Sequence, residues 1–161
     1  MRESFSERGG GWVVAQFALM SAVLAGGVMS RGALGGEWLL APGAVLLVAG
    51  AVFGVAGARV LGKSRTPFPK PRRDARLVRH GIYARVRHPL YTSVMLLSLG
   101  WALCWQSAVA LGLALAQIPF FIAKARREER WLRERFPEYA DYARRVPAFL
   151  PRWRRGTENA D

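Results

Sequence analysis

Three long stretches without a charged residue constrain the fold of this chain more than any other feature. They cover residues 9–30, 38–58 and 89–123, and the last of them is 35 residues long. A helix that crosses the core of a bilayer needs about 20 predominantly apolar residues. The first two stretches each fit one crossing, whereas the third would be about 52 Å long as one helix and instead fits a tight hairpin turning at Gln106 and Ser107. We therefore predict an all-α integral membrane protein with four transmembrane helices and additional cytosolic C-terminal helices.

A chain of 161 residues normally forms one domain, and we expect a single membrane domain over residues 1–161. The charged residues that flank the apolar stretches set the boundaries of its parts. The predicted parts are transmembrane helices at 9–30, 38–60, 89–105 and 107–123, a basic cytosolic loop at 62–88, cytosolic helices at 124–151 and a tail at 152–161. Pro89 suits the first turn of a helix and is expected to begin the third crossing. Gly50 and Gly54 form a small-xxx-small pattern, which favours close helix packing but is also common in glycine-rich membrane helices.

Positive charge predicts the orientation. The formal net charge is +13, with nine Lys or Arg residues in 62–88 and eleven from Lys124 onward. The positive-inside rule places the N-terminus, the basic loop and the C-terminus in the cytoplasm. Arg outnumbers Lys by 21 to 3, which is typical of a GC-rich genome, and we expect a bacterial cytoplasmic (inner) membrane. The charges suit anionic lipid headgroups, and no nucleic-acid-binding motif accompanies them, so membrane lipids rather than nucleic acid are the expected partners.

Several common kinds of site are not expected. Cys104 is the single cysteine and lies in an apolar stretch, which leaves neither a disulfide nor a thiolate metal site. His80 and His88 are not accompanied by other residues at metal-ligand spacing, so we predict no metal. The sequence also lacks a Ser-His-Asp order, a phosphate-binding glycine loop and a dinucleotide fingerprint.

Two polar clusters lie on the predicted cytoplasmic side. The first contains Tyr83, Arg85, Arg87, His88 and Tyr91, and the second contains Glu128, Glu129, Tyr139, Tyr142, Arg144 and Arg145. Because the hairpin returns to the surface from which it starts, His88 and Glu128 are expected to be neighbours in space. Adjacent helical residues are about 100° apart, so one glutamate is expected to face a pocket while Glu129 is free to pair with Arg133. A set of interfacial salt bridges would use the same residues, and both interpretations stay open.

Two segments resemble a known family. "GIYARVRHPLY" and, about 37 residues later, "EERWLRERFPEYADYARRVPAFLP" are similar to the isoprenylcysteine carboxyl methyltransferase and phospholipid methyltransferase superfamily. The resemblance covers residues 77–151. It implies a small integral membrane enzyme that uses S-adenosylmethionine as cofactor and has a lipophilic or lipid-attached substrate.

The resemblance also implies roles for individual residues. The expected cofactor-binding residues are Arg87, His88, Pro89, Tyr91, Glu128 and Glu129, covered by the cytosolic helices, and the expected substrate-binding residues are Tyr83, Tyr139, Tyr142 and Arg145. Arg145 and Glu129 are the expected catalytic residues. A glutamate would bind the cofactor's ammonium or ribose hydroxyls, and Arg87 its carboxylate. A carboxylate substrate oriented by Arg145 would need no base, whereas an ammonium substrate would need a glutamate to remove its proton.

Two departures from the family pattern affect the substrate. The family often has glycine where this chain has Ser93, and the phospholipid branch has Gly-x-Gly where this chain has Ser98-Leu99-Gly100. These departures argue against a strict phospholipid-methylating member. The expected substrate is a lipophilic or isoprenylcysteine-like carboxylate, and the accepting atom, O, N or S, stays open. The oligomeric state is also open. The alternatives are a phospholipid or other small-molecule methyltransferase, an NADPH-dependent sterol-type reductase and a non-catalytic lipid-binding membrane protein.

Overall fold

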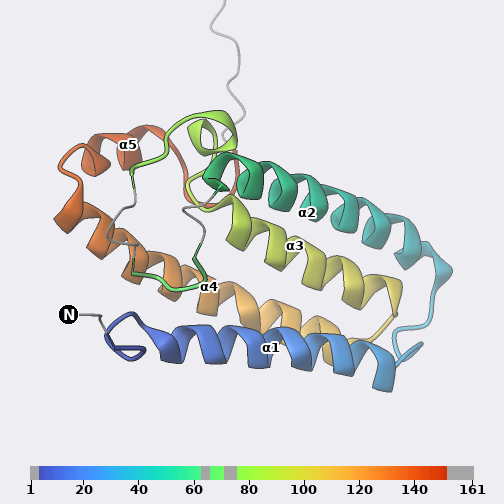
Figure 1. Cartoon of the computed structure of the whole chain (residues 1–161). Coiled ribbons are helices and arrows are strands. Elements are labelled where there is room, and N and C mark those ends of the chain that lie inside the picture. The colour runs from blue at the N-terminus through green and yellow to red at the C-terminus, as the bar shows by residue number, and fades with distance from the viewer. Residues whose placement is uncertain (1–3, 63–65, 71–75, 152–161) are drawn as a thin grey trace, which may run out of the picture.

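Four long helices run side by side in an elongated bundle (Figure 1). The computed structural model describes residues 4–62, 66–70 and 76–151, and within these residues the chain forms helices and turns without a strand. The long helices are α1 (Gly10–Met29), α2 (Leu40–Leu61), α3 (Pro89–Cys104) and α4 (Ala108–Arg135), and the short elements are η1 (Glu37–Leu39), η3 (Gly81–Ala84) and α5 (Tyr139–Arg145). The tail expected at 152–161 lies outside the described residues.

The outward faces of the bundle are apolar, as the sequence predicts for a membrane protein. Within the described residues, three helical segments are long and apolar enough to cross a bilayer: Gly10–Met29, Glu37–Leu61 and Ala108–Arg135. They expose large apolar side chains such as Phe17 and Val48, which a bilayer would cover. The chain is therefore an integral membrane protein. Helix α3 has 16 residues, fewer than the roughly 20 of a typical crossing, and the count of four crossings stays a prediction.

Helices α2 and α3 pack closely because glycines of α2 face α3. A Cβ atom added to Gly50 would lie 3.0 Å from the backbone nitrogen of Leu97, and one added to Gly54 would lie 2.6 Å from the hydroxyl of Ser93. Ser93 also donates a hydrogen bond of 2.7 Å to the carbonyl of Gly50. Ser93, which departs from the family pattern, is thus accommodated by this glycine face.

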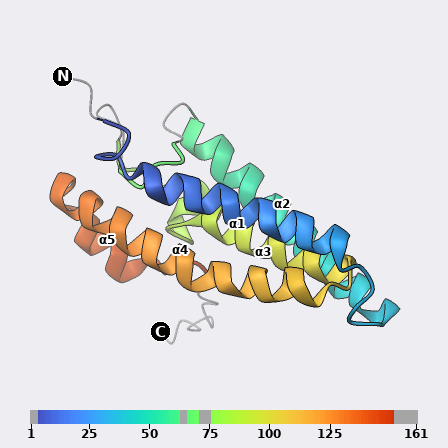
Figure 2. The ribbon, with the colours of Figure 1, turned by 90° about the horizontal axis from the view of Figure 1, so that it is seen from below.

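The short connection between α3 and α4 contains the residues at which a turn was expected. Gln106 has a positive φ of 52°, and the Ser107 side chain caps α4 by accepting a hydrogen bond of 3.0 Å from the backbone of Ala110. This connection and the one after α1 lie at one end of the bundle. The described N-terminal residues, the last turns of α4, α5 and the segment before α3 lie at the other end, as both views show (Figures 1 and 2).

Candidate active site

The two polar clusters meet at the end of the bundle that holds α5. The segment before α3 is fixed by the residues that follow α5. The backbone nitrogens of Arg87 and His88 each donate a hydrogen bond of 2.9 Å, to the carbonyls of Pro147 and Ala148. Thr92 donates a hydrogen bond of 2.8 Å to the carbonyl of Phe149. These contacts place the beginning of α3 directly against the C-terminal part of the described chain.

Glu129 joins the beginning of α3 to α4. Its Oε1 atom accepts hydrogen bonds from Arg87, of 3.0 Å from Nε and 2.8 Å from Nη2, and lies 2.9 Å from Nε2 of His88. The expectation that Glu129 is free to pair with Arg133 is therefore wrong. The long-range pair with Arg87 is partly buried and bidentate on the arginine side, which is stronger than an exposed pair along one helix.

Arg87 also binds the C-terminal end of α5. Its Nη1 atom donates hydrogen bonds to the carbonyl oxygens of Ala143, at 2.7 Å, and Val146. With Glu129, these partners occupy four of the five N–H donors of the guanidinium. Arg87 therefore connects three elements, and little of its hydrogen-bonding capacity is left for a ligand.

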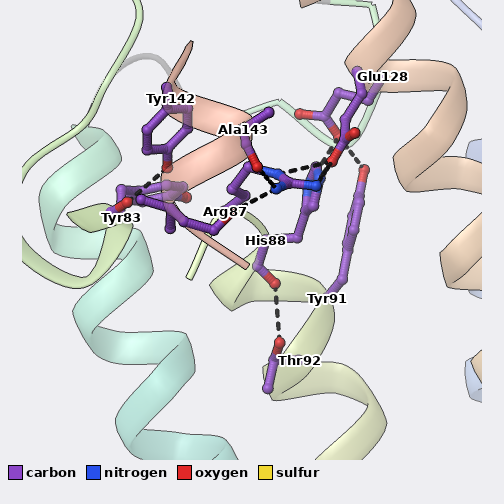
Figure 3. A network of polar contacts seen from close by, with 10 residues as sticks. Tyr83, Arg87, His88, Tyr91, Thr92, Glu128, Tyr142 and Ala143 are labelled. Carbon is purple, nitrogen blue, oxygen red and sulfur yellow. Dashed lines mark hydrogen bonds and ion pairs between the residues drawn. The ribbon is translucent and has the colours of Figure 1, made fainter. Parts of the chain in front are cut away.

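Glu128 lies close to Tyr91 and His88 (Figure 3), nearest to the other ring nitrogen of His88. Its Oε2 atom accepts a hydrogen bond of 2.6 Å from the hydroxyl of Tyr91 and lies 4.0 Å from Nδ1 of His88. As expected, one of the two glutamates, Glu128, faces the cavity, but both reach the His88 ring, at different nitrogens. The ring lies parallel to that of Tyr91, at 10° and 5.4 Å between centroids, and also contacts Phe149.

A cavity lies beside this cluster. Its volume is about 120 Å³, smaller than the roughly 300–1,000 Å³ of typical small-molecule sites. Its polar lining includes Glu128 but not Glu129. The lining residues are mostly apolar or aromatic: Leu61, Thr66, Phe68, Arg76, Leu77, Val78, Tyr83, Arg87, His88, Leu90, Tyr91, Glu128, Leu132, Tyr139 and Tyr142.

The structure brings together most of the residues singled out in the sequence. Tyr83, Arg87, His88, Tyr91, Glu128, Tyr139 and Tyr142 line the cavity. Pro89 is buried at the first position of α3. Glu129 does not line the cavity and instead contacts Nε2 of His88. Arg145 is not brought to the cavity: its side chain is exposed and donates a hydrogen bond of 3.3 Å to the carbonyl of Asp141.

Burial and neighbouring charges shift the pKa values at the site. Burial of the Glu129 carboxyl opposes its ionisation, but the hydrogen bonds and charges of His88 and Arg87 prevail and lower its pKa to about 2. Burial raises the pKa of the Tyr142 hydroxyl to about 12 and raises that of Tyr139 further. Glu129 is therefore a carboxylate at neutral pH, and both tyrosines keep their protons.

Sequence analysis missed one buried cation near the site. Lys124 is fully buried, and its Nζ atom donates hydrogen bonds to the side chain of Gln16 and, at 2.9 Å, to the carbonyl of Pro67. It also lies 5.3 Å from the centroid of the Tyr91 ring. As the first charged residue after a 35-residue uncharged stretch, it resembles an ordinary interfacial lysine, and nothing in the sequence distinguishes its burial.

Parts of the chain are similar in sequence to known proteins. The sequence profile described as phospholipid methyltransferase matches residues 38–139. The cobalt-zinc-cadmium resistance protein CzcN of Cupriavidus metallidurans is 46% identical over 82 residues, which are 50% of this chain and 38% of that protein. The nickel-cobalt-cadmium resistance protein NccN of Alcaligenes xylosoxydans xylosoxydans is 43% identical over 83 residues, again 50% of this chain and 38% of that protein.

A plant enzyme matches a longer part of the chain. Protein-S-isoprenylcysteine O-methyltransferase B of Arabidopsis thaliana is 29% identical over 118 residues, 71% of this chain and 60% of the enzyme. In all three comparisons the match spans less than two thirds of the relative's own length. The profile match covers all of α2, α3 and α4, and ends at the first residue of α5. The chain therefore belongs to the phospholipid methyltransferase family.

Proposed function

We propose that the chain is an S-adenosylmethionine-dependent methyltransferase that acts at the cytosolic membrane face on a lipophilic carboxylate of the isoprenylcysteine type. The observation that carries the proposal is the convergence of His88, Glu128 and Glu129 beside one cavity, in a member of a methyltransferase family. In this proposal α1 to α4 all cross the membrane, and the loop at 62–88 and the helices at 124–151 lie in the cytosol.

The donor set of the cluster fits this cofactor. Glu129 accepts a hydrogen bond from Nε2 of His88, so Nδ1 carries a lone pair when the ring is neutral. Nδ1 and the Glu128 Oε2 atom, 4.0 Å apart, are two acceptors that one ammonium group can bridge.

Each residue then has a defined task. The cofactor supplies a sulfonium-bound methyl group for in-line displacement, which requires alignment above all. Glu128 and His88 bind its cationic end, Tyr91 orients the Glu128 carboxylate, and Glu129 holds the His88 ring. Arg87 holds α3, α4 and α5 together rather than binding the cofactor's carboxylate, because its donors are occupied within the protein.

The substrate is proposed to enter from the bilayer. The cavity combines apolar walls from Leu61, Leu90 and Leu132 with the polar cluster, which suits a lipophilic molecule with one polar end. A carboxylate acceptor is nucleophilic without a base. The role of Arg145 at the substrate's reacting group stays a prediction, and it requires a substrate that extends beyond the cavity to the exposed side of α5.

Binding measurements test this function directly. We expect the protein in lipid nanodiscs to bind S-adenosylmethionine and S-adenosylhomocysteine but not NADPH. Glu128→Gln should weaken cofactor binding by about 10-fold, the value of one charge-assisted hydrogen bond. Glu134→Gln, an exposed acid on the same helix, is the matched control and should bind as the wild type does. A wild type that does not bind S-adenosylmethionine, or a Glu128→Gln variant with full affinity, would contradict the proposal.

Labelled cofactor identifies the substrate class. Incorporation of the methyl group into N-acetyl-S-farnesylcysteine, with none into phosphatidylethanolamine, is the expected result for a carboxylate acceptor. Incorporation into phosphatidylethanolamine alone would favour the phospholipid alternative, in which a glutamate must act as base.

A further inference from the structure

Two tyrosines of α5 have hydroxyl groups in opposite situations. The Tyr142 hydroxyl donates a hydrogen bond of 2.6 Å to the carbonyl of Tyr83. The Tyr139 hydroxyl is buried and has no hydrogen-bond partner in the part of the chain that the structure describes. Tyr139 as a whole is only 1% exposed. A buried hydroxyl without a partner costs free energy, and such a group in a native protein calls for an explanation.

The position of the Tyr139 ring is fixed by its neighbours. It packs edge-to-face on Tyr142, at 69° and 5.8 Å between centroids, and the Arg133 guanidinium lies 5.8 Å from its centroid. Burial keeps the pKa of the hydroxyl above its ordinary value, so the group retains its proton. Tyr139 therefore holds a hydrogen-bond donor in a fixed position, without an acceptor among the described residues.

Tyr139 lines the same cavity as His88 and Glu128. The acceptors suited to a cationic group are on His88 and Glu128, and the Arg87 donors are engaged by Glu129, Ala143 and Val146. A carboxylate of the occupant would thus find few donors on these residues, and Arg76 is the other cation of the cavity lining. The Tyr139 hydroxyl is a donor from α5 that can serve it.

We propose that the Tyr139 hydroxyl donates a hydrogen bond to a carboxylate oxygen of the molecule that occupies the cavity. This inference rests on the proposed function, and the carboxylate belongs either to the cofactor's amino-acid end or to the methyl-accepting substrate. Tyr139 is a binding residue in both cases, and Tyr142 a structural one.

The ligand-free protein provides the first test. Tyr139→Phe removes a hydroxyl that has no partner among the described residues, so the melting temperature should stay unchanged or rise. Tyr142→Phe removes the hydrogen bond to Tyr83 and leaves that carbonyl without it, so the melting temperature should fall. A fall for Tyr139→Phe similar to that for Tyr142→Phe would show that the hydroxyl serves the fold and would overturn the inference.

Ligand binding provides the second test and distinguishes the two carboxylates. If the cofactor's carboxylate is bound, Tyr139→Phe should weaken S-adenosylmethionine binding by about 10-fold and leave the affinity for decarboxylated S-adenosylmethionine unchanged. If the substrate's carboxylate is bound, both cofactor affinities should stay unchanged and the KM for N-acetyl-S-farnesylcysteine should rise about 10-fold. If Tyr139→Phe kept the affinities and the KM of the wild type, the inference about Tyr139 would be overturned and the proposed function would not. If the wild-type protein did not bind S-adenosylmethionine, both would be overturned.

Discussion

Oε1 of Glu129 lies 2.9 Å from Nε2 of His88, although 41 residues separate the two in sequence. The same oxygen accepts two hydrogen bonds from Arg87. One carboxylate oxygen therefore connects the beginning of α3 to the end of α4, and through Arg87 to the carbonyls of α5. We infer that Glu129 mainly holds the other residues of the site in position, whereas Glu128 mainly binds the ligand.

Replacing Glu129 should therefore affect folding more than replacing Glu128. Glu129→Gln removes the charge that compensates a partly buried Arg87, with 13% and 14% of the two side chains exposed. We expect the free energy of unfolding to fall by about 2–3 kcal/mol, the range for hydrogen bonds to charged groups. Denaturant unfolding in detergent micelles measures it, with Glu134→Gln as the exposed control, for which a change within about 0.5 kcal/mol is expected. Equal losses in both variants would refute this division of roles.

The same carboxylate makes stability depend on pH. The pKa of Glu129 is lowered from 4.5 to about 2 in the folded protein, so the folded state binds fewer protons than the unfolded state over this interval. Its contribution to stability is complete above pH 4.5 and is lost as the pH falls toward 2. Melting temperatures measured from pH 6 downward should differ between the wild type and Glu129→Gln above pH 4.5, and this difference should shrink below pH 4.5. A constant difference across this range would show that the charge of Glu129 does not contribute.

The sequence was sufficient to predict much of this site, because span lengths alone place His88 near Glu128. It was not sufficient for the directions of the side chains. The 100° between adjacent helical residues suggested that Glu128 and Glu129 face different ways, but both side chains are long enough to reach the two nitrogens of one ring. The burial of Lys124 depends on contacts with Gln16 and Pro67, which come from distant segments that no local pattern brings together.

Lys124 should be important for the wall of the cavity. It bridges α1, the segment that contains Pro67, and α4, and Phe68 next to Pro67 lines the cavity. Lys124→Met keeps the length of the side chain but leaves the Gln16 and Pro67 oxygens without their donor. We expect a loss of about 2 kcal/mol in the free energy of unfolding.

Arg126→Met is the control for this substitution, because Arg126 lies two residues further along α4 and is exposed. Its effect on unfolding should stay within about 0.5 kcal/mol. Cofactor affinity should also fall in Lys124→Met, since the adjoining wall of the cavity loses its anchor, and should not fall in Arg126→Met. A Lys124→Met protein as stable as Arg126→Met would contradict the bridging role.

The contact between α2 and α3 should not tolerate a side chain at Gly50. A Cβ atom there would lie 2.8 Å from Cγ and 3.0 Å from the backbone nitrogen of Leu97, and the backbone cannot move without shifting α3. Gly50→Ala is therefore expected to lower the free energy of unfolding by about 1–3 kcal/mol through overpacking. It should also weaken cofactor binding, because α3 begins at the residues that hold the cluster. Gly112→Ala in α4, where no heavy atom lies within 4 Å of the added Cβ, is the control and should be neutral or stabilising, because alanine favours helix by up to about 1 kcal/mol. If Gly50→Ala were as stable as Gly112→Ala, the close approach of α2 to α3 would not be required by the fold.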